Sequence, residues 1–331
     1  MGTRTMLHRR RLPALAALGL AAAPAAAQQQ RPAAPFPNRP IRVVVPYAPG
    51  GGTDLTTRLF ADAIRPMLGQ PVVVEARPGA NGVIGSEAVA RSEPDGHTLV
   101  AVTSGHVLNR YTMPNMPFDP VRDFAAVSLM TRFALVLVGG MHTPYGDMPG
   151  LLAHARANPG AVSIGSTTAL GSATAQEFGR AAGIAFTEVP YRGGGAMMLD
   201  IMAGTIDAGW TSPQSAMPHL GSGRVRILGI SSRGRAVQLP QVPSIAESGV
   251  PGFESTSWFG LLGPAGLPPA AAGRIHDAIA EAIRDPATRA RAIELGCDGV
   301  VEGPDAFAAI IRADDARWAA AAREGLLPQV R

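Results

Sequence analysis

The stretch VVVPYAPGGGTDLTTRLFADAI, residues 43–64, decides the fold. Its apolar run ends at Pro46, three consecutive glycines follow, and an amphipathic segment opens at Thr53. This order predicts a buried strand over 41–45, a glycine-rich loop and a helix over 53–68. Because free backbone N–H groups and the positive end of the macrodipole meet at a helix N-terminus, the loop is a candidate anion site.

The same strand-then-helix order repeats along the chain, as short β-type runs alternate with longer helical patterns. Such alternation predicts an α/β fold with mostly parallel sheets. The sequence also echoes itself, because VPYAPGGG at 45–52 resembles VPYRGGG at 189–195. The echo suggests two similar lobes, each presenting a strand-to-helix loop to a shared cleft. We expect strands near 41–45, 72–75, 98–103, 134–138, 162–165, 186–189, 208–210, 225–231 and 258–262, and helices near 53–68, 82–92, 148–158, 172–182, 194–203, 270–284, 286–295 and 305–323.

The N-terminal residues have the pattern of an export signal. A basic start with Arg9–Arg11 precedes an apolar run from Leu12 to about Ala23, which is too short to span a bilayer. The small residues Ala25–Ala27 then supply a cleavage site. We therefore expect a signal peptide at 1–27 and a mature protein in the periplasm. The tandem arginines leave both the general and the twin-arginine export routes open.

Composition excludes several classes of function. The net charge is +4 and the chain has no lysine. Four of the arginines lie in the signal, so the mature protein is near neutral, and its few aromatic residues are not interleaved with basic ones. We expect no nucleic acid partner. After the signal, no window of about 18 residues is apolar and free of charge, so we expect a soluble mature protein. The single cysteine, Cys297, allows no internal disulfide.

Three loops are candidates for binding an anion, at Gly50–Asp54, Thr167–Ala173 and Tyr191–Gly195. Each follows an expected strand, and ligands of open α/β sheets collect at the carboxyl ends of the strands. Arg192 is the cation best placed to pair with a carboxylate. Taken singly, each loop is also compatible with an ordinary glycine-containing connection.

Nucleotide and enzyme motifs are absent. A phosphate-binding P-loop needs a lysine, the glycine spacings do not complete G-x-G-x-x-G, and Asp54 would repel a polyphosphate. Neither G-x-S-x-G nor H-E-x-x-H occurs, and the histidines form no cluster with metal-ligand spacing. We therefore expect no cofactor, no metal and no catalysis. Of the histidines, only His106 follows an expected strand end near the cleft, where a structural role is the stronger alternative.

Several segments together resemble the periplasmic solute receptors of tripartite tricarboxylate transporters, the TctC-like proteins also called the Bug family. The likeness runs in order from about Pro37 to Arg323. It is carried by PYAPGGGTD (46–54), PGANGVIGSEAVARSEPDGHTL (78–99), FDPVRDFAAVSL (118–129), VPYRGGGAMMLDIMAGTID (189–207) and SWFGLLGPAG (257–266).

The resemblance implies a type II periplasmic binding protein fold, with two α/β lobes that close on a small carboxylate. It implies a first lobe at 38–133 and 255–331, a second lobe at 134–254, and a hinge near 132–138 and 255–262. The expected partners are the carboxylate and the membrane permease components of the transporter, and we expect a monomer. Carried over by position, the ligand-binding residues are Tyr47, Gly51, Gly52, Thr53, Asp54, Ser104 and His106 of the first lobe, and Thr167, Thr168, Gly171, Ser172, Ala173 and Tyr191 of the second, to which Arg192 and Thr211 are added.

Two departures from the family pattern bear on the ligand. Relatives commonly carry Asp-Asn where this chain has Thr211-Ser212, and loop 167–173 lacks the usual Ser-Gly-rich form. A neutral hydroxyl in place of a carboxylate disfavours a cationic amino group, which leaves dicarboxylic, tricarboxylic, hydroxy and aromatic acids open. At Gly52 a β-branched residue would block positive φ and close approach, so Gly52→Val is predicted to weaken binding by about 1 kcal/mol or more.

Two alternatives to a transport receptor stay open at this stage. One is an exported α/β hydrolase or transferase that uses Ser104 with His106. The other is a receptor whose closed form docks on a sensor kinase.

Overall fold

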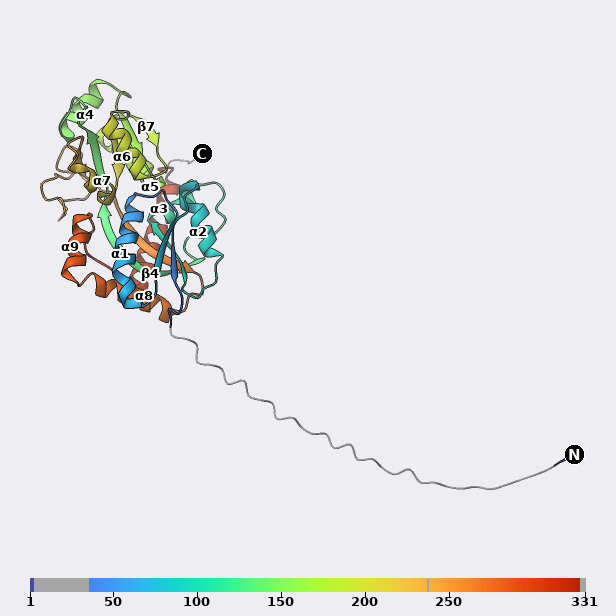
Figure 1. Ribbon diagram of the computed structural model, residues 1–331. Helices are drawn as coiled ribbons and strands as arrows, with labels where there is room; N and C mark the ends of the chain where they lie inside the picture. The colour runs from blue at the N-terminus through green and yellow to red at the C-terminus, as the bar shows by residue number, and fades with distance from the viewer. Residues whose placement is uncertain (3–35, 237, 328–331) are drawn as a thin grey trace. The chain divides into compact units, whose positions relative to one another are not determined.

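Two five-stranded sheets organise the part of the chain that the structure describes, residues 1–2, 36–236 and 238–327 of a computed structural model (Figure 1). The predicted signal peptide lies outside these residues apart from its first two. The residues from Phe36 onward form one compact unit. Among the described residues, no helix has both the length and the apolar character needed to cross a bilayer.

The first sheet has the strand order β2-β1-β3-β10-β4. Its strands come from both ends of the compact unit, and its helices precede and follow the second sheet in sequence. The strands are β1 (Ile41–Val45), β2 (Val72–Ala76), β3 (Thr98–Thr103), β4 (Phe124–Ala134) and β10 (Thr256–Pro264), and the helices are α1 (Gly52–Leu68), the 3-10 turn η1 (Ala80–Gly82), α2 (Val83–Ala90), α3 (Gly105–Thr112), α8 (Pro269–Ala282), α9 (Pro286–Glu294) and α10 (Pro304–Arg323).

The second sheet has the order β7-β6-β8-β5-β9. All of its strands come from one continuous part of the chain, as the green and yellow colours in Figure 1 show. The strands are β5 (Val136–Gly140), β6 (Ser163–Ser166), β7 (Thr187–Pro190), β8 (Ala208–Thr211) and β9 (Val225–Ile230), and the helices are α4 (Met148–Ala157), α5 (Ala169–Ala182), α6 (Gly194–Ala203) and α7 (Pro213–Leu220).

The prediction of mostly parallel sheets is wrong, because both sheets are mixed. β10 runs antiparallel to β3 and β4, and β5 runs antiparallel to β8 and β9, whereas β1, β2, β3 and β6, β7, β8 pair in parallel. The chain passes between the sheets from β4 to β5 and from β9 to β10, so these strands lack the crossover helix that makes neighbours parallel. The strand predicted over 134–138 is accordingly two strands that meet at Leu135.

The two passages between the sheets hydrogen-bond to each other. The N–H of Ser231 donates to the carbonyl of Leu135 (2.8 Å), and the N–H of Ser255 donates to the carbonyl of Ser231 (2.8 Å). The N–H of Leu135 in turn donates to the carbonyl of Ser255 (3.4 Å). All three residues are buried. Adjacent backbone segments tied in this way fix the position of a hinge while leaving rotation about it to a few residues.

Helix α1 shows how local sequence sets the elements that reach the cleft. Phe60, Ile64 and Leu68 recur on one face and are buried against the first sheet. The helix ends at Gly69, which adopts the left-handed conformation with φ 65°. Pro66 lies in the last turn, yet the helix continues to Leu68.

Candidate functional site

A cavity lies where the loops after β1, β6, β7 and β8 meet the two hinge strands β4 and β10. The space within it that no atom fills amounts to about 530 Å³, the open mouth included. The lining residues are Tyr47, Ala48, Gly51, Gly52, Thr53, Thr103, Phe133, Leu135, Thr167, Thr168, Leu170, Arg192, Gly193, Gly194, Thr211, Ser212, Ser215, Ser257 and Phe259.

The loop after β1 brings the N-terminus of α1 to the cavity. Gly51 is the N-cap and has no side chain to accept a hydrogen bond from the first turn, in which the N–H of Gly52 donates to a side chain of another helix. Asp54, buried in that turn, accepts from the N–H of Gly50 (3.0 Å) and from Nε of Arg58 (2.9 Å). Its carboxylate is therefore used inside its own loop and helix, and Asp54 does not line the cavity.

Gly52 is the contact between the lobes at the cavity edge. Its N–H donates to Oγ of Ser215 in α7 (2.8 Å). A Cβ at this position would lie 2.2 Å from Oγ of Ser212 and 2.8 Å from Cζ of Phe259. Gly52 does not have positive φ, so the first half of the reason given for Gly52→Val is wrong. Glycine is required here by close approach alone.

The loop after β7 brings the N-terminus of α6 to the same place from the opposite lobe. Its N-cap, Gly193, also provides no side-chain oxygen for the first turn. A Cβ on Gly193 would lie 2.8 Å from Cβ of Ala48, and one on Gly51 would lie 3.9 Å from the nitrogen of Gly194. Two helix N-termini without a side-chain cap, one from each lobe, thus converge on one region of the cavity.

Two further helices start at the cavity, and both have a side-chain cap. Oγ1 of Thr168 accepts from the N–H of Gly171 at the start of α5 (3.2 Å). Oγ of Ser212 accepts from the N–H of Ser215 at the start of α7 (3.3 Å). At each of these helix starts the N-cap side chain accepts from a first-turn N–H, whereas the glycine N-caps of α1 and α6 provide no such oxygen.

Buried hydroxyl groups face the cavity. Thr53 and Thr211 are 5% and 3% exposed, both line the cavity, and neither hydroxyl hydrogen-bonds to a described residue. Burial raises the pKa of Tyr47, whose phenol therefore stays protonated and can donate. Arg192, which is exposed, has the only charged side chain among the described residues that line the cavity.

The structure brings some of the predicted site residues together and leaves others apart. Tyr47, Gly51, Gly52, Thr53, Thr167, Thr168, Arg192 and Thr211 all line the cavity. The predicted residues that do not line it are Asp54, Ser104, His106, Gly171, Ser172, Ala173 and Tyr191. Tyr191 instead donates its phenol hydrogen to Asp200 (2.6 Å), which contributes with burial to raising the pKa of Tyr191 to about 12.

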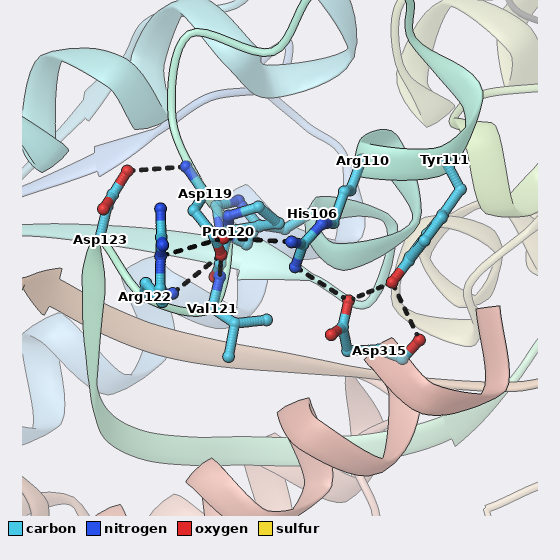
Figure 2. A network of polar contacts seen from close by, with 9 residues as sticks. All are labelled: His106, Arg110, Tyr111, Asp119, Pro120, Val121, Arg122, Asp123 and Asp315. Atoms are coloured by element: carbon cyan, nitrogen blue, oxygen red, sulfur yellow. Dashed lines mark hydrogen bonds and ion pairs between the residues drawn. The ribbon is translucent and has the colours of Figure 1, made fainter. Parts of the chain in front are cut away.

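His106 belongs to a structural network beside the first sheet (Figure 2). Its Nε2 lies 3.2 Å from the carbonyl of Pro120, and its ring stacks on Phe118 with centroids 5.5 Å apart. Burial lowers the pKa of His106 to about 4, so the ring is neutral at pH 7. The neighbouring Arg110 bridges Asp119 (3.2 Å) and Asp315 of α10 (3.4 Å). The network holds the 117–123 segment, not a ligand.

Sequence reasoning missed the cavity residues of the hinge strands. Phe133, Leu135 and Phe259 fall in segments predicted as hinge, the last two also as strand, and not as binding residues, although they line the cavity. Ser215 was missed because α7 was not predicted, and Ser212 was noticed only as a departure from the family. The order of apolar and polar residues along β4 and β10 does not show which face of these strands lines the cavity. The other unpredicted lining residues are Ala48, Thr103, Leu170, Gly193, Gly194 and Ser257.

Behind the cavity, α7 also contacts the first lobe. Nε2 of Gln214 donates to the carbonyl of Gly296 (2.8 Å), and Sγ of Cys297 lies 3.9 Å from both Nε2 of Gln214 and Oγ1 of Thr56. Cys297 is fully buried, and burial raises the pKa of its thiol to about 11.

The fold and this cavity define a type II periplasmic binding protein, in which two α/β lobes enclose a ligand cleft. The chain belongs to the receptor family of tripartite tricarboxylate transporters, because the TctC family model, described as a tripartite tricarboxylate transporter family receptor, matches residues 56–325. The family consists of substrate-binding receptors, not enzymes.

Individual relatives agree with this assignment. BugT of Bordetella pertussis is 34% identical over 94% of this chain and 96% of its own length. The structure of MatC from Rhodopseudomonas palustris with bound malate has a TM-score of 0.79 and 28% identity, covering 87% of this chain and 100% of that one. A second R. palustris structure, with adipate, has a TM-score of 0.83 and 28% identity, covering 89% and 100%.

Proposed function

We propose that the protein captures a small organic carboxylate in the cavity between its lobes and delivers it unchanged to the membrane permease of a tripartite tricarboxylate transporter. The observation that carries the proposal is the convergence of two helix N-termini without a side-chain cap, α1 from one lobe and α6 from the other. Each supplies N–H donors and the positive end of a macrodipole.

A carboxylate held between two lobes would favour their closure. Charge-assisted hydrogen bonds from the first turns of α1 and α6 would join the lobes through the ligand. A ligand shifts a conformational equilibrium only through its differential affinity for the two states, and contacts to both lobes provide that difference. The malate and adipate in the structures of two relatives support a carboxylate as the ligand.

The contact residues are proposed from the cavity lining. The predicted residues that line it remain in the proposed site, and Ser212 and Ser215 join them through their hydroxyl groups. Asp54, His106 and Tyr191 are engaged elsewhere, and Ser104, Gly171, Ser172 and Ala173 do not reach the cavity lining. The proposed set is Tyr47, Gly51, Gly52, Thr53, Thr167, Thr168, Arg192, Thr211, Ser212 and Ser215.

A thermal-shift and calorimetric screen of carboxylic acids tests the function. A true ligand at about 100 times Kd should add about 2.7 kcal/mol to the free energy of unfolding. The acid should be recovered chemically unchanged after incubation. If no mono-, di- or tricarboxylate, hydroxy, amino or aromatic acid shifts the melting temperature, the function is refuted.

The hydrolase alternative finds no support at the residues it requires. Oγ of Ser104 lies 2.8 Å from Oγ of Ser257, whereas His106 contacts Pro120 and, at 3.5 Å, Oγ of Ser86. Ser104 and His106 therefore do not form a nucleophile–base pair in the described geometry. Docking on a sensor kinase would use the same capture step, and a pull-down with the permease subunits distinguishes the two roles.

Location, assembly and lobe boundaries are also proposals. We expect export by a signal peptide at 1–27, periplasmic location and a monomer, which N-terminal sequencing of the periplasmic fraction and light scattering would test. The lobe boundaries 38–133, 134–254 and 255–331 are supported by the strand memberships, since β4 ends at Ala134 and β5 begins at Val136.

A further inference from the structure

The floor of the cavity is apolar. It is formed at the hinge by Phe133 and Leu135, where β4 passes into β5, and by Phe259 on β10. The rings of Phe133 and Phe259 lie 4.4 Å apart between centroids, with an angle of 39° between their planes. Leu135 and Phe259 are 5% and 3% exposed, and Phe133 is partly buried.

The charges around the cavity suit one anion. Arg192 supplies the only charge among the described lining residues, and it is exposed. The nearest acidic group along the chain, Asp54, is buried beside the lining residue Thr53 but is paired with Arg58. The helix starts without side-chain caps converge at one place, near Gly51 and Gly194.

Two hydroxyl groups add neutral hydrogen-bonding capacity. Thr53 and Thr211 are more than nine-tenths buried, line the cavity and have no hydrogen-bond partner among the described residues. Oγ1 of Thr211 lies 3.2 Å from where a Cβ on Gly194 would be, so it borders the start of α6. Neither hydroxyl is engaged by a described residue, so each can donate to or accept from a ligand.

We propose that the ligand is a monocarboxylic acid with a neutral apolar body, aromatic or branched, and without an amino group. This rests on the proposed function and narrows it to a chemical class. The carboxylate lies between the starts of α1 and α6, near Thr53 and Thr211, and the body lies on Phe133, Leu135 and Phe259.

The excluded classes fail on desolvation. A second carboxylate lying against Phe133, Leu135 and Phe259 would lose its hydration beside apolar side chains, and burying an unpaired charge is far more costly than burying a ring. An ammonium group would sit among the positive ends of helix dipoles with no free carboxylate to pair with. An aromatic or branched body gains about 25 cal/mol for each Å² of apolar surface removed from water.

Matched pairs of acids test the inference on the unmodified protein by isothermal titration calorimetry. Benzoate and terephthalate differ by one carboxylate, 3-phenylpropanoate and phenylalanine by one amino group, and cyclohexanecarboxylate and adipate by ring against second carboxylate. We expect the first member of each pair that binds to do so at least tenfold more tightly than the second.

The outcomes separate the two levels of the proposal. If terephthalate, adipate, malate or an amino acid binds as tightly as the monocarboxylates or more tightly, the inference is overturned and the carboxylate receptor stands. If no acid of any class binds, both are overturned.

A substitution on the floor provides a second test. Phe133 is only partly buried, so Phe133→Gln should fold, and it should weaken binding of the tightest monocarboxylate at least fivefold. The conservative variant Phe133→Leu keeps the surface apolar and should retain more of the affinity than Phe133→Gln does. Equal affinities for wild type and a folded Phe133→Gln would show that the body does not lie on this floor, and would overturn the inference.

Discussion

At the scale of the residue, Gly52 decides how near the lobes can come. A methyl group in place of its hydrogen would lie too close to Oγ of Ser212 and to the ring of Phe259. Gly51, one position earlier, has φ −78° and only ordinary contacts around its open side, the nearest at 3.5 Å. Neighbouring glycines in one loop thus have different reasons for being glycine.

We therefore expect Gly52→Ala to weaken binding of the tightest acid at least tenfold, because the added methyl group separates the lobes and removes the Gly52–Ser215 hydrogen bond. Gly273→Ala in α8, where a Cβ would meet no heavy atom within 4 Å, serves as the control and should bind within about threefold of wild type. Calorimetric affinities and far-ultraviolet circular dichroism of both variants check the prediction. Equal affinities for the two variants would contradict the role of close approach.

His106 carries the pH dependence that the structure predicts most directly. Burial lowers its pKa from 6.5 to about 4, so the unfolded chain binds a proton in this interval before the folded protein does. The free energy of unfolding contributed by the neutral ring is complete above pH 6.5 and is lost as the pH falls toward 4. With about 1.4 kcal/mol for each pH unit, the loss is about 3 kcal/mol.

Urea unfolding at pH 7.5 and 4.5 measures this effect. His106→Gln keeps a side-chain N–H for the carbonyl of Pro120 but has no proton to gain in this range. Its free energy of unfolding should therefore fall less than that of wild type between the two pH values. Parallel losses in both proteins would assign the pH dependence to other groups.

At the scale of the element, α7 links the lobes. Its N-cap Ser212 lies beside the cavity, Oγ of Ser215 accepts from the N–H of Gly52, and Nε2 of Gln214 donates to the carbonyl of Gly296. It belongs to the second sheet's part of the chain but contacts α1 of the first. The hydrogen bonds of its first turn therefore hold the helix against the opposite lobe.

Ser215→Ala should weaken ligand binding about fivefold to one hundredfold, because a buried N–H left without an acceptor costs about 1–3 kcal/mol in the state where the lobes meet. Ser163 offers a matched control. Its Oγ also accepts a backbone N–H, from Asp207 (2.9 Å), but this hydrogen bond lies within the second lobe and does not join the lobes. Ser163→Ala should lower the melting temperature and leave the affinity near that of wild type. Urea unfolding and calorimetry on both variants separate the two effects.

Sequence patterns predicted the elements with strong periodicity or glycine punctuation. Helix 194–203 matches α6 at both ends, and strands 41–45 and 98–103 match β1 and β3. The short helices α3 and α7 were missed, as was most of β4. α7 starts at Pro213 and contains Pro218, and a proline inside a helical pattern argues against a helix unless tertiary contacts support it.

The candidate site divides in the same way. The repeated glycine motif predicted the loops at the starts of α1 and α6, because a loop that needs a close backbone approach carries glycine at that position in the sequence. The floor at Phe133, Leu135 and Phe259 was not predicted, because the faces of crossover strands are set by how the two sheets meet. Ser104 and His106 were assigned by position along the chain, whereas the structure engages them with Ser257 and Pro120.

At the scale of the whole molecule, we expect capture of a ligand to be coupled to closure of the lobes. The passages between the sheets are hydrogen-bonded to each other at Leu135, Ser231 and Ser255, and we expect the lobes to rotate about that region. The contacts that must separate for opening lie on the other side of the cleft, at Gly52–Ser215 and around Cys297. Ligand contacts to both lobes would oppose that separation.

The burial of Cys297 makes the chain its own reporter of this motion. The thiol lies between α1 and α7, and it is the only one in the sequence. A thiol reagent can therefore modify only this residue, and the rate of modification reports how often the lobes separate around it. Adding the acid should slow the reaction of Cys297 with an aromatic disulfide reagent, followed by its colour change, in proportion to the fraction of protein that has bound ligand. The Cys297→Ser variant serves as the blank. Equal rates with and without ligand would mean that modification of Cys297 depends on local unfolding and not on separation of the lobes.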